Sequence, residues 1–266
     1  MKARSFSTTV LSFGLAFLYV PLIVVMVYSF NASKLVTVWA GFSTQWYGEL
    51  LSDGQLLGAA GNSVIVALLS ASLAAVVGTA TGYALARFGR FRGRAILTGT
   101  VAVPLVLPDV IAGLSLLLLF VALEQAFSWM PGRGIFTIVI AHTTLTMAYV
   151  AVIVQARLVG MDRDVEEAAA DLGAKPFTVF RLITLPMIKP AIIAGWLLAF
   201  VLSLDDLVIA SFVSGPQSTT LPMVVYSSIR LGVSPKINAL ATVLIITTFV
   251  LLALAAWIGR NTLKSK

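Results

Sequence analysis

The chain has 266 residues, of which 59% are hydrophobic and 11% charged, and its formal net charge is +7. A soluble domain of this length would carry about 25% charged residues, so the composition excludes an ordinary soluble globular protein and indicates a membrane protein. The absence of cysteine excludes disulfides and thiolate metal sites, and a single histidine excludes a metal site built from several histidines.

Six apolar segments are long enough to span the hydrocarbon core of a bilayer, which takes about 20 helical residues. The first is expected to be a retained helix, because it is too long for a signal peptide and no small-residue cleavage site follows Phe30. Pro104 and Pro108 predict a kink in the third segment. The six segments are Val10–Phe30, Ser63–Ala86, Ala95–Leu123, Ile135–Val154, Ala191–Val213 and Ile237–Ile258.

Lysine and arginine are distributed unequally over the segments that these six helices would leave outside the membrane. The two termini and the loops after the second and fourth helices hold 14 of them, against 4 on the opposite side. The positive-inside rule therefore places both termini in the cytoplasm. We expect an all-α protein with one transmembrane domain at residues 10–258 and cytoplasmic tails at 1–9 and 259–266. The basic residues do not cluster on one face, so no nucleic-acid partner is predicted.

Several polar and aromatic residues fall near the predicted membrane boundaries. Asn62, Arg87 and Arg157 are interpreted as boundary residues at the ends of helices. The longer outer loops, at about residues 31–62 and 214–236, contain aromatic side chains of the kind that anchor proteins at the membrane interface. These aromatic residues, for which we predict interfacial anchoring, are Trp39, Trp46, Tyr47 and Tyr226.

The densest group of acids lies in a cytoplasmic loop, in the string EEAAADLGAKPFTVFRLITLP at residues 166–186. The pattern predicts two short helices. Asp164 is expected to cap the first in a capping box with Glu167, and Gly173 is expected to end it in the left-handed conformation. The second is expected at Phe177–Thr184, after which Leu185-Pro186 leads into the fifth transmembrane segment.

The first of these short helices has a small, flat apolar face made by Ala168, Ala169 and Leu172. Such a face suits a groove on a partner protein, but an ordinary amphipathic connector between two transmembrane helices would show the same spacing. The residues alone leave both interpretations open.

A family resemblance bears on this choice. The pattern Glu167-Ala168-Ala169, Gly173, Ile183 and Leu185-Pro186 is similar, without a gap, to the signature loop of the membrane subunits of bacterial ABC importers. The resemblance implies that the loop at 155–190 couples the chain to a cytoplasmic ATPase subunit. The residues expected to carry this coupling are Glu166, Glu167, Ala168, Ala169, Leu172, Gly173, Ile183, Leu185 and Pro186.

Longer stretches resemble the polyamine importers within this class. The most similar is the second permease of putrescine systems, and the rival is the spermidine/putrescine permease. The strings that carry this resemblance are SFNASKLVTVWAGFSTQWYGELL, RFGRFRG, PLVLPDVIAGLSLLLLFVAL and LAFVLSLDDLVIASFVSGPQSTTLPMVVYSSIRLGV.

The resemblance implies a MetI-like permease of six helices in the bacterial inner membrane. It also implies a second permease subunit as heterodimer partner, two ATPase subunits and a periplasmic polyamine-binding protein. No Gly-Lys dipeptide of a P-loop occurs, so ATP and Mg²⁺ are expected on the partner subunits, and the chain itself is expected to bind no cofactor and to be no enzyme. The alternatives are an ABC permease for another solute and a self-sufficient secondary transporter, although the inverted repeats frequent in secondary transporters are not evident.

Three acids lie within predicted membrane helices: Asp109, Asp205 and Asp206. Each costs about 2.5–3.5 kcal/mol near a helix centre, and such residues usually face a bundle interior or an aqueous path. At about 1.5 Å per residue, Asp109, Asp205 and His142 would reach a similar level, roughly 22–24 Å from the cytoplasmic edge. We predict that the acids line a cation path. The alternative is that they stabilise an interrupted helix.

Overall fold

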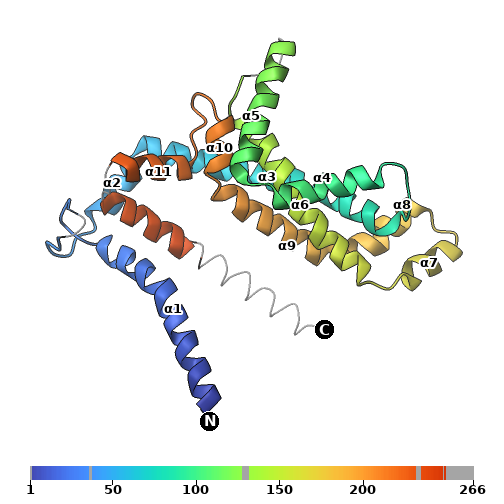
Figure 1. Cartoon of the computed structure of the whole chain (residues 1–266), viewed down its shortest axis with the longest axis horizontal. Helices are drawn as coiled ribbons and strands as arrows, with labels where there is room; N and C mark the ends of the chain where they lie inside the picture. Colours follow the sequence, from blue (N-terminus) through green and yellow to red (C-terminus); the bar gives the residue numbers. More distant parts are fainter. Residues whose placement is uncertain (1, 36–37, 128–131, 232–234, 248, 250–266) are drawn as a thin grey trace. The chain divides into compact units, whose positions relative to one another are not determined.

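The computed structural model describes residues 2–35, 38–127, 132–231, 235–247 and 249, and within them the regular elements are helical apart from one isolated bridge between Asn31 and Phe42. The all-α prediction is therefore confirmed. The elements are α1 (Lys2–Tyr28), α2 (Gln45–Ser52), α3 (Gly54–Arg87), α4 (Arg94–Val106), α5 (Asp109–Ala126), α6 (Ile135–Val159), α7 (Asp164–Asp171), α8 (Pro176–Val179), the π-helical turn η1 (Phe180–Thr184), α9 (Leu185–Leu204), α10 (Val208–Val213) and α11 (Leu221–Leu231) (Figure 1).

Five helical runs in the described residues are long and apolar enough to cross a membrane. They are Thr8–Tyr28, Gly54–Arg87, Asp109–Ala126, Ile135–Val159 and Pro176–Leu204, and two shorter apolar helices cover Arg94–Val106 and Pro235–Thr247. The predicted sixth segment, Ile237–Ile258, extends outside the described residues. The count of six spans, the domain boundaries and the cytoplasmic termini therefore stay predictions.

The chain forms two compact units, residues 59–223 and residues 1–58 with 224–266. In the first of these, α6 packs against α9, α4 and α3. A Cβ at Gly78 would lie 2.7 Å from the Cβ of Val150, and one at Gly82 would lie 2.6 Å from the carbonyl oxygen of Ala151. These two glycines therefore let the backbones of α3 and α6 approach closely, as small residues do in membrane helix pairs.

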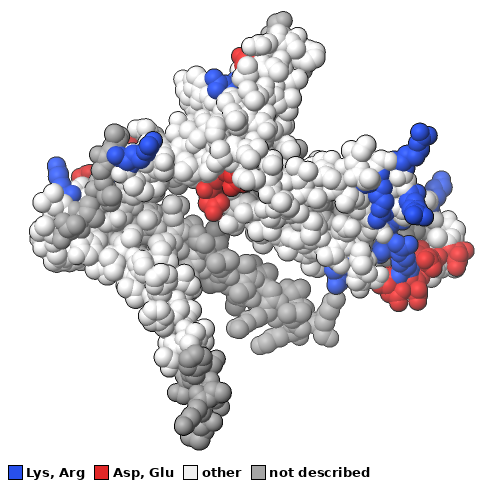
Figure 2. Space-filling model, in the orientation of Figure 1, with Lys and Arg blue, Asp and Glu red and all other residues white. Residues whose placement is uncertain are grey.

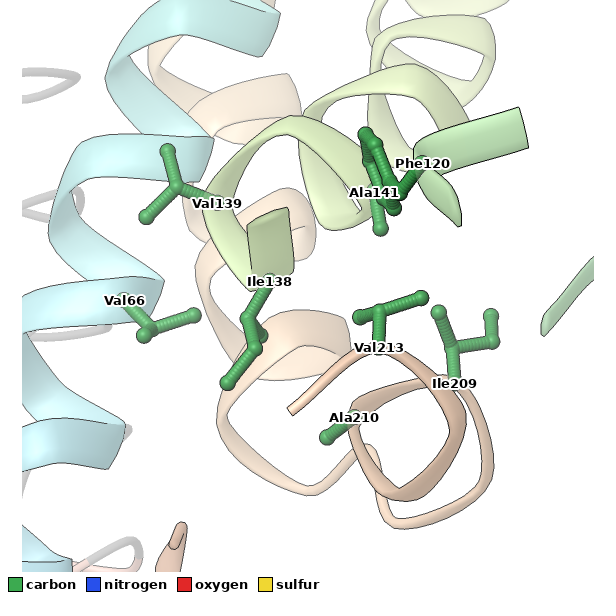
Figure 3. Close-up of a cluster of buried hydrophobic side chains, with 8 residues drawn as sticks. All are labelled: Val66, Phe120, Ile138, Val139, Ala141, Ile209, Ala210 and Val213. Atoms are coloured by element: carbon green, nitrogen blue, oxygen red, sulfur yellow. The ribbon is translucent and has the colours of Figure 1, made fainter. Parts of the chain in front are cut away.

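A core cluster in this unit joins four helices. Figure 3 shows its side chains from α3, α5, α6 and α10 meeting around the first half of α6. Dense packing here fixes the short helix α10 against α5 and α6, which places the polar residues just before α10. The cluster consists of Val66, Phe120, Ile138, Val139, Ala141, Ile209, Ala210 and Val213.

Two predicted transmembrane helices are interrupted. The third segment has a break where a kink was predicted: α4 ends at Val106, Leu107 is extended, and α5 begins at Asp109. The ring of Pro108 disfavours helical backbone at the residue before it, which explains the extended Leu107. The fifth segment is divided as well, because α9 ends at Leu204 and α10 begins only at Val208.

The other unit contains α1, α2 and the loop between them, which is organised around Asn31. The fully buried Asn31 accepts backbone hydrogen bonds from Ser33 and Ala40 and donates one to Val38, while Trp46 donates to its carbonyl oxygen at 2.6 Å. Trp46 is only 4% exposed. The prediction that it anchors the chain at the interface is therefore wrong, since its ring packs inside the loop.

The other three aromatic residues predicted to anchor the chain lie differently. Trp39 and Tyr226 are exposed, and Tyr47 shares a hydrogen bond of 2.7 Å with Ser29. In the same unit, Lys236 donates a hydrogen bond to the carboxylate of Asp53. This bond, with one from a backbone N–H, lowers the pKa of the Asp53 carboxyl.

Candidate functional site

A cavity of about 350 Å³ opens among α4, α5, α6, α9 and α10 in the unit at residues 59–223. We call it the acidic cavity, because all three acids predicted within the membrane line it together with His142. In Figure 2 a group of acidic side chains stands within a wide uncharged surface. The lining residues are Pro104, Asp109, His142, Leu145, Thr146, Tyr149, Leu202, Ser203, Asp205, Asp206, Leu207, Val208 and Ile209.

Asp206 is held by the protein itself. One carboxylate oxygen accepts hydrogen bonds from His142 Nε2 at 3.1 Å and from the backbone N–H of Ala210 at 2.8 Å, and the other faces the backbone N–H of Ile209 at 3.4 Å. The carboxylate thereby satisfies backbone donors in the first turn of α10. One member of the adjacent acid pair thus stabilises the interrupted helix, which is the alternative role that the sequence left open for these acids.

His142 connects Asp206 to a buried chain of hydroxyl groups. Its Nδ1 lies 2.7 Å from Ser203 Oγ, which lies 2.9 Å from Ser70 Oγ on α3, and the imidazole is only 2% exposed. Because a carboxylate only accepts hydrogen bonds, the Nε2 atom facing Asp206 carries a proton. His142 therefore orients Asp206 and fastens α6 to α9 and α3, a task that its position in the sequence did not disclose.

Asp205 and Asp109 are the two acids that stay available to a ligand. Both are exposed, and within the described residues neither carboxylate takes part in an ion pair. Asp205 ends α9, and Asp109 stands in the first turn of α5, where negative charge is favourable. The acidic cavity thus combines one fixed carboxylate with two exposed ones and can receive a cation.

The loop at residues 155–190, predicted to be cytoplasmic, contains the second group of predicted site residues. Its helix α7 begins one residue earlier than predicted, since Arg163 is the residue before the helix and Asp164 already belongs to it. The predicted capping box is therefore wrong: the carboxylate of Asp162 accepts the backbone N–H of Asp164 at 3.2 Å instead. The hydrogen bond between the two side chains, and the charge of Asp162, raise the pKa of the Asp164 carboxyl.

The end of α7 is as predicted. Gly173 has φ +84°, and Gly173 and Ala174 donate to the carbonyls of Ala170 and Ala169, which together make a Schellman motif. The second short helix differs from the prediction, because α8, η1 and α9 form one continuous run. The π-helical turn η1 lies just before Pro186, whose missing N–H and bulky ring disturb regular α-helical bonding there.

The predicted coupling residues divide by exposure. Leu172 is 89% exposed and Glu167, Ala168, Gly173 and Pro186 are also exposed, whereas Ala169, Ile183 and Leu185 are half-buried. Glu166 points inward: its side chain is only 13% exposed and pairs with Arg87, the last residue of α3, at 2.9 Å. Sequence reasoning missed this use of Arg87, since a basic residue at a helix end is already explained by membrane topology.

Comparison with known proteins places this architecture in a class. The structure of a bacterial ABC transporter involved in the import of alginate superposes with a TM-score of 0.74, 15% sequence identity, and coverage of 98% of this chain and 97% of that one. The MetNI methionine ABC transporter gives a TM-score of 0.60 with 17% identity over 75% of this chain and 92% of that one. The fold is thus the MetI-like permease fold.

The chain belongs to the family described as binding-protein-dependent transport system inner membrane component, which it matches over residues 74–264. It is 60% identical to the putrescine transport system permease protein PotI of Escherichia coli (strain K12), over 89% of this chain and 84% of that protein. It is 41% identical to the spermidine/putrescine transport system permease protein PotC of the same strain, over 94% and 92%. It is therefore a multi-pass inner-membrane transport component.

Proposed function

We propose that the chain is a permease subunit of an ATP-driven importer for putrescine or a closely related polyamine. The observation that carries the proposal is the 60% identity, over 89% of the chain, to a putrescine transport system permease. The acidic cavity supports it independently, because a diamine carries two positive charges at neutral pH and carboxylates bind alkylammonium groups through charge-assisted hydrogen bonds.

The remaining parts of such an importer are expected on other chains. A second permease would complete the translocation path, a periplasmic binding protein would deliver the polyamine, and two ATPase subunits would bind ATP and Mg²⁺. The absence of a Gly-Lys dipeptide in this chain agrees with hydrolysis elsewhere. The exposed face of α7, with Leu172 and its neighbours, would dock on an ATPase subunit, and Asp109 and Asp205 would attract the cationic substrate.

Uptake of labelled putrescine tests the proposal directly. Cells that lack this gene should regain uptake when the gene is restored, and lose it again when the partner ATPase cannot hydrolyse ATP. Uptake that resists excess spermidine would assign a putrescine system, whereas competition would assign a shared polyamine system. Restored uptake that is independent of the ATPase would instead indicate a secondary transporter, and no uptake of either amine would indicate another solute.

A further inference from the structure

The C-terminal end of α3 holds a buried ion pair that no transport step so far described uses. Arg87 has a side chain only 7% exposed; its Nη1 donates to the carbonyl oxygen of Leu158 at 3.0 Å, and its Nε lies 2.9 Å from a carboxylate oxygen of Glu166. One guanidinium thus joins the ends of α3 and α6 to the first turn of α7. Arg87 and Glu166 are far apart in the chain, so their contact is a tertiary link between α3 and α7.

The other oxygen of Glu166 is also in use. It accepts a hydrogen bond of 2.7 Å from Oγ1 of Thr184, which is fully buried in the π-helical turn before α9. The carboxylate therefore bridges α3 and the α8–α9 run. A buried charge is tolerated only when it is paired, so loss of Arg87 or of Glu166 would leave the other charge without compensation, whereas loss of Thr184 would remove one hydrogen bond.

Two further contacts bring the same helix ends together. Arg163, in the turn before α7, donates to the carbonyl oxygen of Ala86 at 2.9 Å, and the ring of Tyr83 lies edge-on to Phe180 with centroids 5.0 Å apart. Arg87 of α3 thus donates to a carbonyl at the end of α6, and Arg163 of the α6–α7 turn donates to a carbonyl at the end of α3. Figure 1 shows the ends of α3 and α6 together with α7 and α8 at one end of the helical group.

The two sides of α7 are therefore unlike. Its inward side is fixed through Glu166, while Leu172 and Val165 are exposed. Along the chain, α7 is connected only through short turns, at residues 160–163 and at Gly173–Lys175. Turns of this kind absorb displacement, whereas a buried ion pair supported by the hydrogen bond from Thr184 resists it.

We propose that Arg87, Glu166 and Thr184, which we call the anchor, position α7 so that its movement is passed to α3 and α9. These are positioning residues, since the exposed face of α7 rather than the anchor would meet the ATPase. The proposal rests on the docking role given to α7 under the proposed function. Without the anchor, α7 would still bind its partner, but its displacement would be taken up in the two turns instead of moving the transmembrane helices.

The test compares Glu166→Gln, Arg87→Gln and Thr184→Val in the complete complex of both permeases and both ATPase subunits. Glu166→Gln removes the charge but keeps an acceptor for Thr184, and Thr184→Val removes one hydrogen bond while Arg87 stays paired. We expect ATP hydrolysis to persist while polyamine transported per ATP falls at least about fivefold in the two charge variants, the low end of usual coupling free energies. Thr184→Val should give a smaller fall.

A matched control and a double variant sharpen the result. Arg92→Gln removes an exposed arginine just beyond α3 that makes no ion pair within the described residues, and should leave transport per ATP unchanged. The double variant Arg87→Gln with Glu166→Gln leaves no unpaired buried charge. It should therefore assemble at least as well as either single variant, with a loss of coupling no larger than theirs.

Hydrogen exchange of the α7 amides in the same complex supplies a readout that needs no substrate. Faster exchange at α7 in Glu166→Gln, but not in Arg92→Gln, is expected. Unchanged exchange together with unchanged transport per ATP would overturn the anchor and leave the proposed function intact. Absence of polyamine transport in the parent complex would refute the proposed function, while exchange at α7 would still decide the anchor. If both charge variants fail to assemble, normal transport per ATP in Thr184→Val and in the double variant would overturn the proposed role of the anchor.

Discussion

Asp205 and Asp206 are neighbours in the sequence with different surroundings, and this difference separates the effects of substituting them. The carboxylate of Asp206 accepts bonds from His142 and from the start of α10, while that of Asp205 is exposed in the acidic cavity. Asp206→Asn should therefore destabilise the assembled complex by about 1.5–3 kcal/mol, the usual value of hydrogen bonds to a charged group. Thermal unfolding of the Asp206→Asn complex and of the parent complex in detergent measures this loss of stability.

Asp205→Asn should instead leave assembly and unfolding temperature unchanged and lower polyamine uptake at least about tenfold, since a charge-assisted hydrogen bond to the substrate is lost. Glu124→Gln supplies a matched control, because Glu124 is an exposed carboxylate on α5 that does not line the acidic cavity. Normal uptake by Asp205→Asn would exclude this residue from the cation path, and an equal loss in Glu124→Gln would indicate a general effect of negative charge.

Gly173 acts through its backbone conformation, since it ends α7 in the left-handed region. Its φ of +84° is unfavourable for residues with a Cβ, although no other atom lies within 4 Å of the position that a Cβ would occupy. Gly173→Val should therefore cost about 1–2 kcal/mol in the turn through backbone strain alone. We expect α7 to lose its defined end, and transport per ATP to fall in reconstituted complexes that still hydrolyse ATP.

Asparagine tolerates the left-handed conformation better than valine, so Gly173→Asn is the informative comparison. It should retain more transport per ATP than Gly173→Val at equal levels of assembled complex. Equal activity of the two variants would mean that the left-handed turn does not matter for coupling.

At the scale of elements, α3 packs against α6 at Gly78 and Gly82, where the neighbouring helix leaves no space for a side chain. Alanine usually stabilises an exposed helical position by about 0.5–1 kcal/mol relative to glycine. At Gly82 the sign should reverse, because the added Cβ would lie 2.6 Å from a backbone oxygen that cannot move away without shifting α6. Gly82→Ala should therefore destabilise the protein by about 1–3 kcal/mol, as overpacking does, measured by thermal unfolding.

Gly61, on the same helix α3, has no atom within 4 Å of its virtual Cβ and is the control. Gly61→Ala should unfold at the same or a higher temperature than the parent protein. If Gly82→Ala behaved like Gly61→Ala, the close approach of α3 and α6 would be contradicted.

Helix identity was predictable from hydrophobic runs, and the interruptions were predictable only in part. Pro108 predicted that the helix would be disturbed there. Whether the helix bends or breaks depends on how α5 packs, and α5 packs through Gly113 against Phe212 of α10. At Pro186 the outcome is the reverse. Two separate helices were predicted around this residue, but the helix continues past it by way of a π-helical turn. A proline reports lost backbone bonding, while tertiary packing decides how the backbone accommodates it.

The candidate site shows the same division. The three acids were found because a charge within a membrane helix is expensive, and stabilisation of an interrupted helix was one of the two roles that the sequence left open for them. Which acid has which role could be assigned only from the structure, because the hydrogen-bond partners of Asp206 come from α6 and α10. The contact of Arg87 with Glu166 and the burial of Trp46 were missed for a common reason: each residue type has a frequent role at membrane boundaries, which gave no sign of a contact distant in the sequence.

At the scale of the whole molecule, the acidic cavity and the anchor lie in the same unit and are joined by continuous helices. The α8–α9 run contains Thr184 of the anchor in its π-helical turn and ends at Leu204, directly before Asp205 in the cavity. α6 likewise extends from its packing with α5 and α10 to Leu158 at the anchor. A displacement at one end of these helices therefore has a continuous helical route to the other, and rigid secondary elements of this kind are among the structures that carry coupling between distant sites.

The distribution of charge makes a prediction about orientation that the chain is well suited to test. Of the 18 lysines and arginines, 14 lie on the side predicted to be cytoplasmic, and the chain contains no cysteine, so single cysteines report their own location. Glu49→Cys and Thr178→Cys introduce thiols at exposed positions, the first in a segment predicted to lie outside and the second in the loop predicted to be cytoplasmic. In intact cells with a permeable outer membrane, a charged maleimide should label only Glu49→Cys, while a membrane-permeant maleimide should label both. Labelling of Thr178→Cys by the charged reagent would invert the orientation and move α7 away from any cytoplasmic ATPase.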